Sequence, residues 1–182
     1  MTDPNVTRYH PALVALHWIM ALGIFLLLVV GGPMLAKLAS NDPMKITGMQ
    51  GHMAIGMIVG LLLALRLALK LLTRTPPHAD VGHKTLNSGA KLAHIGLYVL
   101  MAGMVGSGIA MAYAADLFAI AYGGADLPVP DDMSVYTPRV AHGVIGKLLL
   151  ALILAHLAGV LYHMVLRRDR LLRRMWFGKR TV

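Results

Sequence analysis

The chain has 182 residues, of which 57% are hydrophobic and only 14% are charged, and it contains no cysteine. A soluble globular domain carries about a quarter charged residues, so this composition argues against an ordinary soluble protein and indicates an integral membrane protein. The absence of cysteine excludes disulfides, thiolate zinc sites and iron–sulfur clusters, which leaves any metal chemistry to the nine histidines. The net charge of +9 would suggest nucleic acid in a soluble protein, but its distribution here indicates membrane topology, and we expect no nucleic-acid partner.

Four apolar stretches predict four membrane-spanning helices at residues 11–32, 46–72, 88–115 and 138–166. Each approaches or exceeds the ~20 residues that a spanning helix needs, and each is bounded by Pro, Gly, Asn or Asp. Pro33 and Pro43 are expected to flank the first loop. The first stretch is too long and too weakly basic at its start for a cleaved signal peptide, so we expect it to remain in the mature protein. Residues 1–182 are therefore predicted to form a single all-α, four-helix transmembrane bundle.

The distribution of Lys and Arg predicts the orientation of this bundle. Arg8, four basic residues in 70–91 and seven in 167–180 lie on one side, whereas only Lys37, Lys45 and Arg139 lie on the other. By the positive-inside rule both termini are cytoplasmic, and the basic tail contacts anionic lipid. The third loop then faces outward with its acidic residues, Asp116, Asp126, Asp131 and Asp132.

Histidines inside the predicted spans are the main functional candidates, because ionisable side chains are costly in a membrane. Five lie well within the spans, a sixth lies near the inner end of the last span, and three fall in the tail or loops and are expected to be solvated. In that order they are His17, His52, His94, His142 and His156; His163; and His10, His78 and His83.

The five histidines form two layers. His52 and His142 lie near the outer ends of their helices, and His17, His94 and His156 lie near the inner ends. His142 and His156 are separated by fourteen residues, which at ~1.5 Å per residue places them on nearly one face, ~21 Å apart. Haem b suits such layers, because imidazoles are its axial ligands, and two histidines per iron favour electron transfer over oxygen binding. The spacing selects the outer pair but cannot choose two of the three inner histidines.

Neighbouring residues allow two interpretations each. Gly56 and Gly146, each four residues after an outer histidine, make room for a flat macrocycle or only for helix packing. Arg66 reaches an inner haem propionate or only snorkels toward the membrane surface. A single intramembrane histidine can also be an interhelical hydrogen-bonding residue, and for His94 alone that reading would suffice.

Several segments carry a specific resemblance. RYHPALVALHW, HMAIG continuing to LRLALKLLTRTPP, AHGVIGKLLLALILAHLAGVLYH and the tail motif LLRRM resemble the bacterial cytochrome b561 family over nearly the whole chain. The resemblance implies a multi-pass protein of the bacterial cytoplasmic (inner) membrane with two b haems, similar to the cytochrome b subunits of membrane hydrogenases.

The resemblance also implies roles for individual residues. It makes His17 and His156 the axial ligands of the haem on the cytoplasmic side. It makes His52 and His142 those of the haem on the periplasmic side. The inner-side residues His94, His163 and Arg66 then become neighbours of the haem or parts of a quinone site.

Stand-alone members of the family oxidise periplasmic superoxide and pass the electron through both haems to ubiquinone. Here the few outer basic residues would attract such an anion, but the four Asp of the third loop oppose them. Lys147, one turn beyond His142, departs from the uncharged residue usual in the family; it contacts an outer propionate or snorkels.

Three functions follow from these features. The first is a superoxide:ubiquinone oxidoreductase. The second is an electron relay, either the cytochrome b subunit of a larger dehydrogenase or hydrogenase or the acceptor of a periplasmic electron carrier, for which an acidic outer loop suits a basic partner. The third is a haem-free transporter or proton-conducting bundle.

Overall fold

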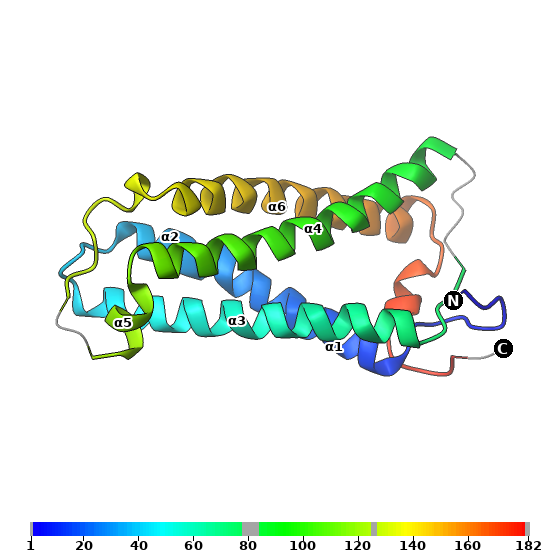
Figure 1. Cartoon of the computed structure of the whole chain (residues 1–182). Coiled ribbons are helices and arrows are strands. Elements are labelled where there is room, and N and C mark those ends of the chain that lie inside the picture. Colours follow the sequence, from blue (N-terminus) through cyan, green and yellow to red (C-terminus); the bar gives the residue numbers. More distant parts are fainter. Residues whose placement is uncertain (1, 78–83, 125–126, 181–182) are drawn as a thin grey trace.

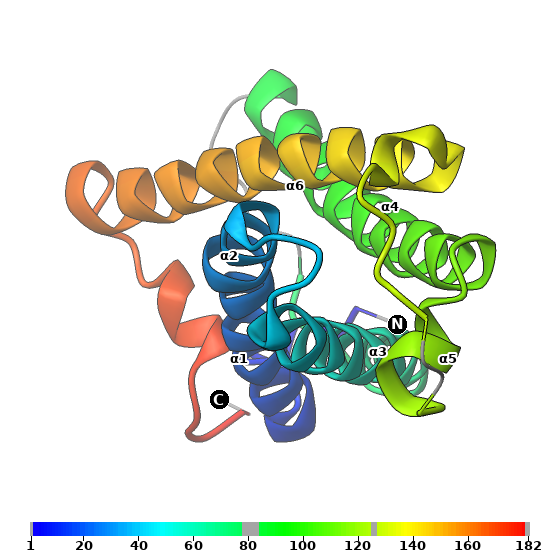
Figure 2. The same cartoon turned by 90° about the vertical axis from the view of Figure 1, so that its left-hand side faces the viewer.

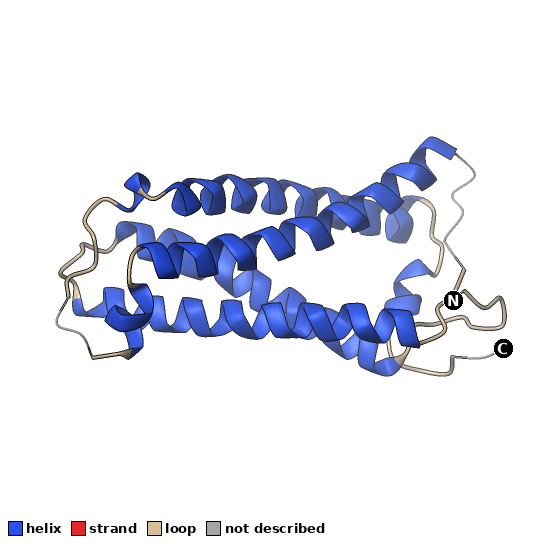
Figure 3. Cartoon of the chain, viewed as in Figure 1, coloured by secondary structure: helices blue, strands red, loops and turns tan. Residues whose placement is uncertain are grey.

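The structure is a computed structural model that describes residues 2–77, 84–124 and 127–180, and this part is helical without any β-strand (Figures 1 and 3). His78, His83 and Asp126 lie outside the described residues. The α-helices are α1 (Pro11–Phe25), α2 (Gly32–Lys37), α3 (Pro43–Leu72), α4 (Lys84–Ala114), α5 (Leu117–Tyr122) and α6 (Thr137–Leu161). Two π-helical turns (Leu26–Gly31 and Tyr162–Leu166) and two 3-10 turns (Met133–Val135 and Leu171–Met175) complete the elements.

Four helical segments are long and apolar enough to cross a membrane, which confirms the predicted four-helix bundle. They are Pro11–Lys37, Pro43–Leu72, Lys84–Ala114 and Thr137–Leu166. Helix α1 packs along α3, α4 packs along α6, and α3 contacts α4 (Figure 2). The chain begins and ends at one end of the bundle, and α5 lies at the other (Figure 1). The structure therefore gathers at one end the segments that carry most of the basic residues.

The first span is longer than predicted. The helix does not end at residue 32 but continues through a π-helical turn into α2, which ends at Lys37. The Gly32 N–H reaches back to the Leu27 carbonyl. Pro33, which has no N–H, lies in the first turn of α2 and does not flank the loop as predicted. Lys45 Nζ then closes the turn by donating to the carbonyls of Leu35 and Leu38, at 2.7 and 2.9 Å.

Helix α3 begins at Pro43, three residues before the predicted start. The Asp42 side chain accepts the Met44 N–H at 2.8 Å, and proline at the first helical position already has the φ angle of a helix. Both features extend the helix outward from its apolar stretch. The third span begins four residues and ends one residue before its predicted bounds, and the fourth begins one residue early and ends at residue 166 as predicted.

The outer end is closed by α5, which was expected to be loop. Leu117, Ile120 and Ala121 of α5 are buried in one cluster with Met49 of α3 and Ala112 of α4. The helix is short, but its apolar side chains lose their water contacts against two longer helices.

The contact between α5 and α3 lies close to His52. Gln50 Nε2 donates to the Ala121 carbonyl at 2.5 Å, and the Tyr122 hydroxyl donates to the Gln50 carbonyl at 2.6 Å. Because Gln50 is two residues before His52, the third loop folds onto the end of α3 that carries an outer histidine.

The basic tail folds back over the start of α1. The Thr7 N–H donates to the Arg180 carbonyl at 2.7 Å, and Arg8 Nη1 donates to the Phe177 carbonyl at 2.6 Å. The Trp18 indole N–H donates to the Met175 carbonyl at 2.9 Å, and its ring meets Trp176 edge to face. The tail is thus an ordered cover on the end where the inner histidines lie.

Candidate functional site

The outer histidines face each other across the bundle. The ring centroids of His52 on α3 and His142 on α6 are 6.2 Å apart, with an interplanar angle of 65°. Two imidazoles that bind opposite faces of one metal through bonds of about 2.0 Å have their centroids roughly 6.3 Å apart. The spacing of this pair therefore fits two axial ligands of one iron.

Ser107 on α4 fixes the tautomer of His142. Its Oγ lies 3.0 Å from His142 Nδ1 and 2.7 Å from the Gly103 carbonyl. Since the carbonyl can only accept, the hydroxyl donates its one proton there and accepts from the protonated Nδ1 of His142. Nε2 of His142 then carries the free lone pair that a metal ligand needs.

His52 is held by packing rather than by a hydrogen bond. Its Nδ1 is buried and has no hydrogen-bond partner in the described part of the chain. Gly31, in the first π-helical turn, lies directly against it, and a Cβ built on Gly31 would be 2.5 Å from Nδ1. Buried polar atoms without a hydrogen-bond partner are rare and often mark functional sites. π-Helical turns also occur frequently at functional sites.

Three inner histidines converge at the other end. The centroids of His94 and His156 are 5.3 Å apart with an interplanar angle of 84°, so the rings touch edge to face. This separation is about 1 Å less than two ligands of one metal require. His94 Nδ1 donates to the Ala90 carbonyl at 2.6 Å, and His17 lies close enough to interact electrostatically with Arg66, His156 and His94.

Arg66 ties three helices together. Its Nε donates to the Tyr98 hydroxyl on α4 at 3.2 Å, and its Nη1 donates to the Leu13 carbonyl on α1. Lys70 Nζ also lies 5.0 Å from the centre of the Tyr98 ring. Arg66 therefore points into the bundle and does not simply snorkel toward the membrane surface. Its partner Tyr98 was missed by the sequence analysis.

His163 lies in the second π-helical turn and pairs with the tail. Its Nδ1 is 2.6 Å from Asp169 Oδ2, and Arg167 Nε is 3.6 Å from the same oxygen. Burial raises the pKa of the Asp169 carboxyl, but hydrogen bonds with His163 and the Leu171 N–H outweigh this effect and lower the pKa overall.

A family model, prokaryotic cytochrome b561, matches residues 8–178 and so nearly the whole chain. The chain belongs to the prokaryotic cytochrome b561 family. No individual curated protein matches it significantly. The resemblance noted from the sequence is thereby confirmed, and this cytochrome b561 is a membrane electron-transfer protein of the b-type haem class. Family membership argues against the haem-free transporter.

The residues of this cytochrome b561 fit a haem better than a bare metal ion. Within residues 2–77, 84–124 and 127–180 no group of three or more His, Cys, Asp or Glu side chains could hold a metal. A haem iron needs only two protein ligands, because the macrocycle supplies the other four nitrogens. A pair of histidines is therefore sufficient to hold the haem that is typical of the family.

The structure favours a different interpretation for each of the two glycines that follow an outer histidine, Gly56 and Gly146. A Cβ built on Gly56, one turn after His52, would meet nothing within 4 Å, whereas one on Gly146 would lie 3.7 Å from the Met104 side chain of α4. Gly56 fits the open space that a macrocycle needs. Gly146 fits the helix-packing interpretation.

Arg139 is a neighbour of the outer pair that the sequence analysis counted only for topology. It lies one turn before His142, and its charge acts on the rings of both His52 and His142. Its spacing of three residues from His142 could have shown from the sequence that the two side chains lie on the same side of the helix. Lys147, by contrast, is exposed on α6. The sequence analysis also missed Ser107, for which the only signal in the sequence was a polar residue within an apolar span.

Proposed function

We propose that this cytochrome b561 holds two b haems, one between His52 and His142 and one between His17 and His156. The observation that carries the proposal is the 6.2 Å separation of the outer rings, with the His142 tautomer fixed by Ser107. For the inner site, the short contact of His94 with His156 favours His94 as a neighbour that orients His156 rather than as the opposite ligand.

We propose further that the chain takes electrons from superoxide on the outer side and delivers them to ubiquinone near the inner side. Haem b, when bound, supplies a one-electron carrier at each site. Two superoxide anions are oxidised to two O₂ for each ubiquinone reduced to ubiquinol, which also takes up two protons. The inner end of the bundle is then cytoplasmic, as its basic residues favour, and the protein lies in a bacterial inner membrane.

Arg139 supports an anionic substrate at the outer side. Its positive charge acts on both outer histidines, so an anion approaching them is attracted. Lys45 adds a second positive charge at this end, where its ammonium is oriented by two backbone carbonyls. At the inner end His163, paired with Asp169, is suited to hold a proton for the reduced quinone, and Arg66 is suited to an inner propionate.

A second function rests on the exposed acidic residues of the outer loop. Asp116, Asp131 and Asp132 are exposed at the end where an external donor would dock. A carboxylate surface favours a basic periplasmic carrier or a partner subunit over a small anion. The protein would then be a relay or a cytochrome b subunit.

The purified chain separates these functions. With xanthine and xanthine oxidase as the superoxide source, we expect reduction of a ubiquinone analogue, slowed by Arg139→Gln and by added salt. Lys37→Gln removes a charge from the same end and serves as the control. A chain that contains haem but reduces no quinone with superoxide contradicts the first function and favours the relay.

A further inference from the structure

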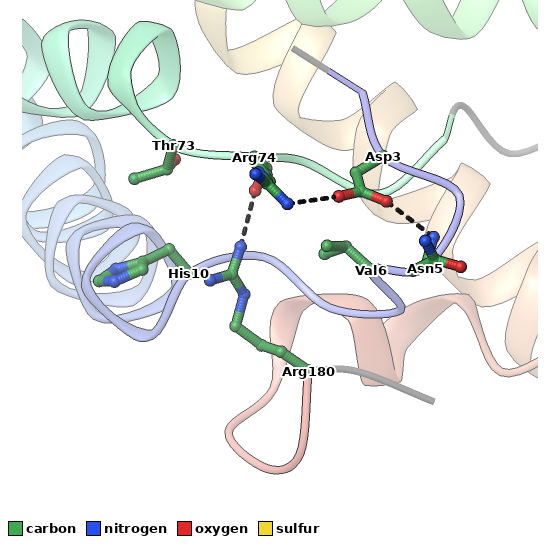
Figure 4. A pocket seen from close by; sticks show the side chains of 7 residues that line it. All are labelled: Asp3, Asn5, Val6, His10, Thr73, Arg74 and Arg180. Atoms are coloured by element: carbon green, nitrogen blue, oxygen red, sulfur yellow. Dashed lines mark hydrogen bonds and ion pairs between the residues drawn. The ribbon is translucent and has the colours of Figure 1, made fainter.

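A polar cleft lies at the end of the bundle where both termini meet (Figure 4). Its volume is about 350 Å³, which suits a small polar group better than a single ion. The walls come from three segments far apart in the sequence: the residues before α1, those directly after α3, and the tail. The polar lining residues are Asp3, Asn5, His10, Thr73, Arg74 and Arg180.

The cleft carries a positive charge that its own residues do not neutralise. Arg74 Nη1 pairs with Asp3 Oδ2 at 3.1 Å. Arg180 instead donates to backbone carbonyls. Its Nε donates to Arg8 at 3.3 Å, and its Nη2 donates to Arg74 at 2.7 Å (Figure 4). Carbonyls orient a guanidinium without cancelling its charge, so two arginines share one carboxylate, and the cleft favours an anion.

An apolar surface adjoins this charge. Leu71 and Leu72, the last two residues of α3, are each 82% exposed, the highest values among the large apolar side chains of the described residues. Thr73 of the cleft follows them directly, and His10 directly precedes α1. The cleft therefore lies at the level where two spans end, which is the headgroup region of a bilayer.

We propose that this cleft binds one anionic phospholipid. The phosphate lies against Arg74 and Arg180, and an acyl chain covers Leu71 and Leu72. The bound lipid joins the N-terminal segment, the end of α3 and the tail. The Thr7 N–H already links the first to the tail through the Arg180 carbonyl, and the Asp3 N–H links it to the residues after α3 through the Thr75 carbonyl. The site is independent of the redox function, because its lining includes none of the proposed haem ligands.

The test is lipid binding to the full-length, haem-loaded protein in detergent. Phosphatidylglycerol is titrated and bound lipid is counted by native mass spectrometry, with phosphatidylcholine and inorganic phosphate as separate probes. We expect one phosphatidylglycerol to bind tightly and Arg74→Gln or Arg180→Gln to weaken it by roughly tenfold or more. Lys179→Gln removes the same charge from an exposed neighbour of the cleft and should leave binding unchanged.

Several results would overturn this proposal. They are equal weakening by Lys179→Gln, equal affinity for phosphatidylcholine, or saturable binding of inorganic phosphate without binding of phosphatidylglycerol. Because Arg180→Gln could release the tail, gel filtration and the haem spectrum check each variant. Arg74→Gln keeps the backbone carbonyl that receives Arg180, so it reports on the site even if the Arg180 variant is disordered.

Discussion

Replacing Gly31 with Ala should remove the outer haem alone. A Cβ on Gly31 would lie 2.5 Å from His52 Nδ1, whereas carbon and nitrogen atoms in ordinary contact stay at about 3.5 Å. The imidazole must therefore retreat by about 1 Å, or the π-helical turn must open. Functional side chains tolerate displacements of only about 0.5 Å, so His52 can no longer serve as an axial ligand opposite His142.

The assay is haem b per chain, from the pyridine haemochrome spectrum and the protein concentration. Gly32→Ala is the matched control, because both glycines have right-handed helical backbones. A Cβ on Gly32 would have only the Leu27 carbonyl oxygen near it, at 3.8 Å. Gly31→Ala should bind about one haem and Gly32→Ala about two. Two haems in the Gly31 variant would refute the role given to this contact.

Three further predictions test other parts of the site. His94→Ala should keep two haems per chain, and a fall to one, measured in the same way, would show that His94 is an inner ligand. Ser107→Ala removes an acceptor of the His142 Nδ1–H, which makes the ring less electron-rich; redox titration should show one haem potential rising and the other unchanged, and two unchanged potentials would contradict this. The lowered pKa of Asp169 stabilises the fold above the unfolded pKa of about 3.9 and ceases to do so as the pH falls through the lowered value. Below about pH 4 the unfolding temperature should therefore fall more steeply for the native chain than for Asp169→Asn, and parallel curves would count against the pairing with His163.

Hydropathy and helical spacing were sufficient for the four spans and the two histidine layers. Depth along a helix follows from the residue number, so His52 and His142 could be paired from the sequence. Three inner histidines lie at similar depth, and their choice depends on rotation and side-chain direction, as the direct contact between His94 and His156 shows. That information comes only from packing between helices.

The missed features depend on contacts distant in the sequence. Helix α5 contains only six residues and is stabilised by burial against α3 and α4, which no local pattern reveals. Pro33 indicates a helix end by itself, yet the preceding π-helical turn accommodates it. Ser107 and His142 are 35 residues apart, so their hydrogen bond could not be read from spacing.

The most direct test of the central claim is the amount of haem b bound by the purified native chain. The pairing of His52 with His142 and of His17 with His156 predicts a pyridine haemochrome value near two per chain. A value near zero in well-folded protein would contradict the account, and a value of one would leave only one of the two sites standing.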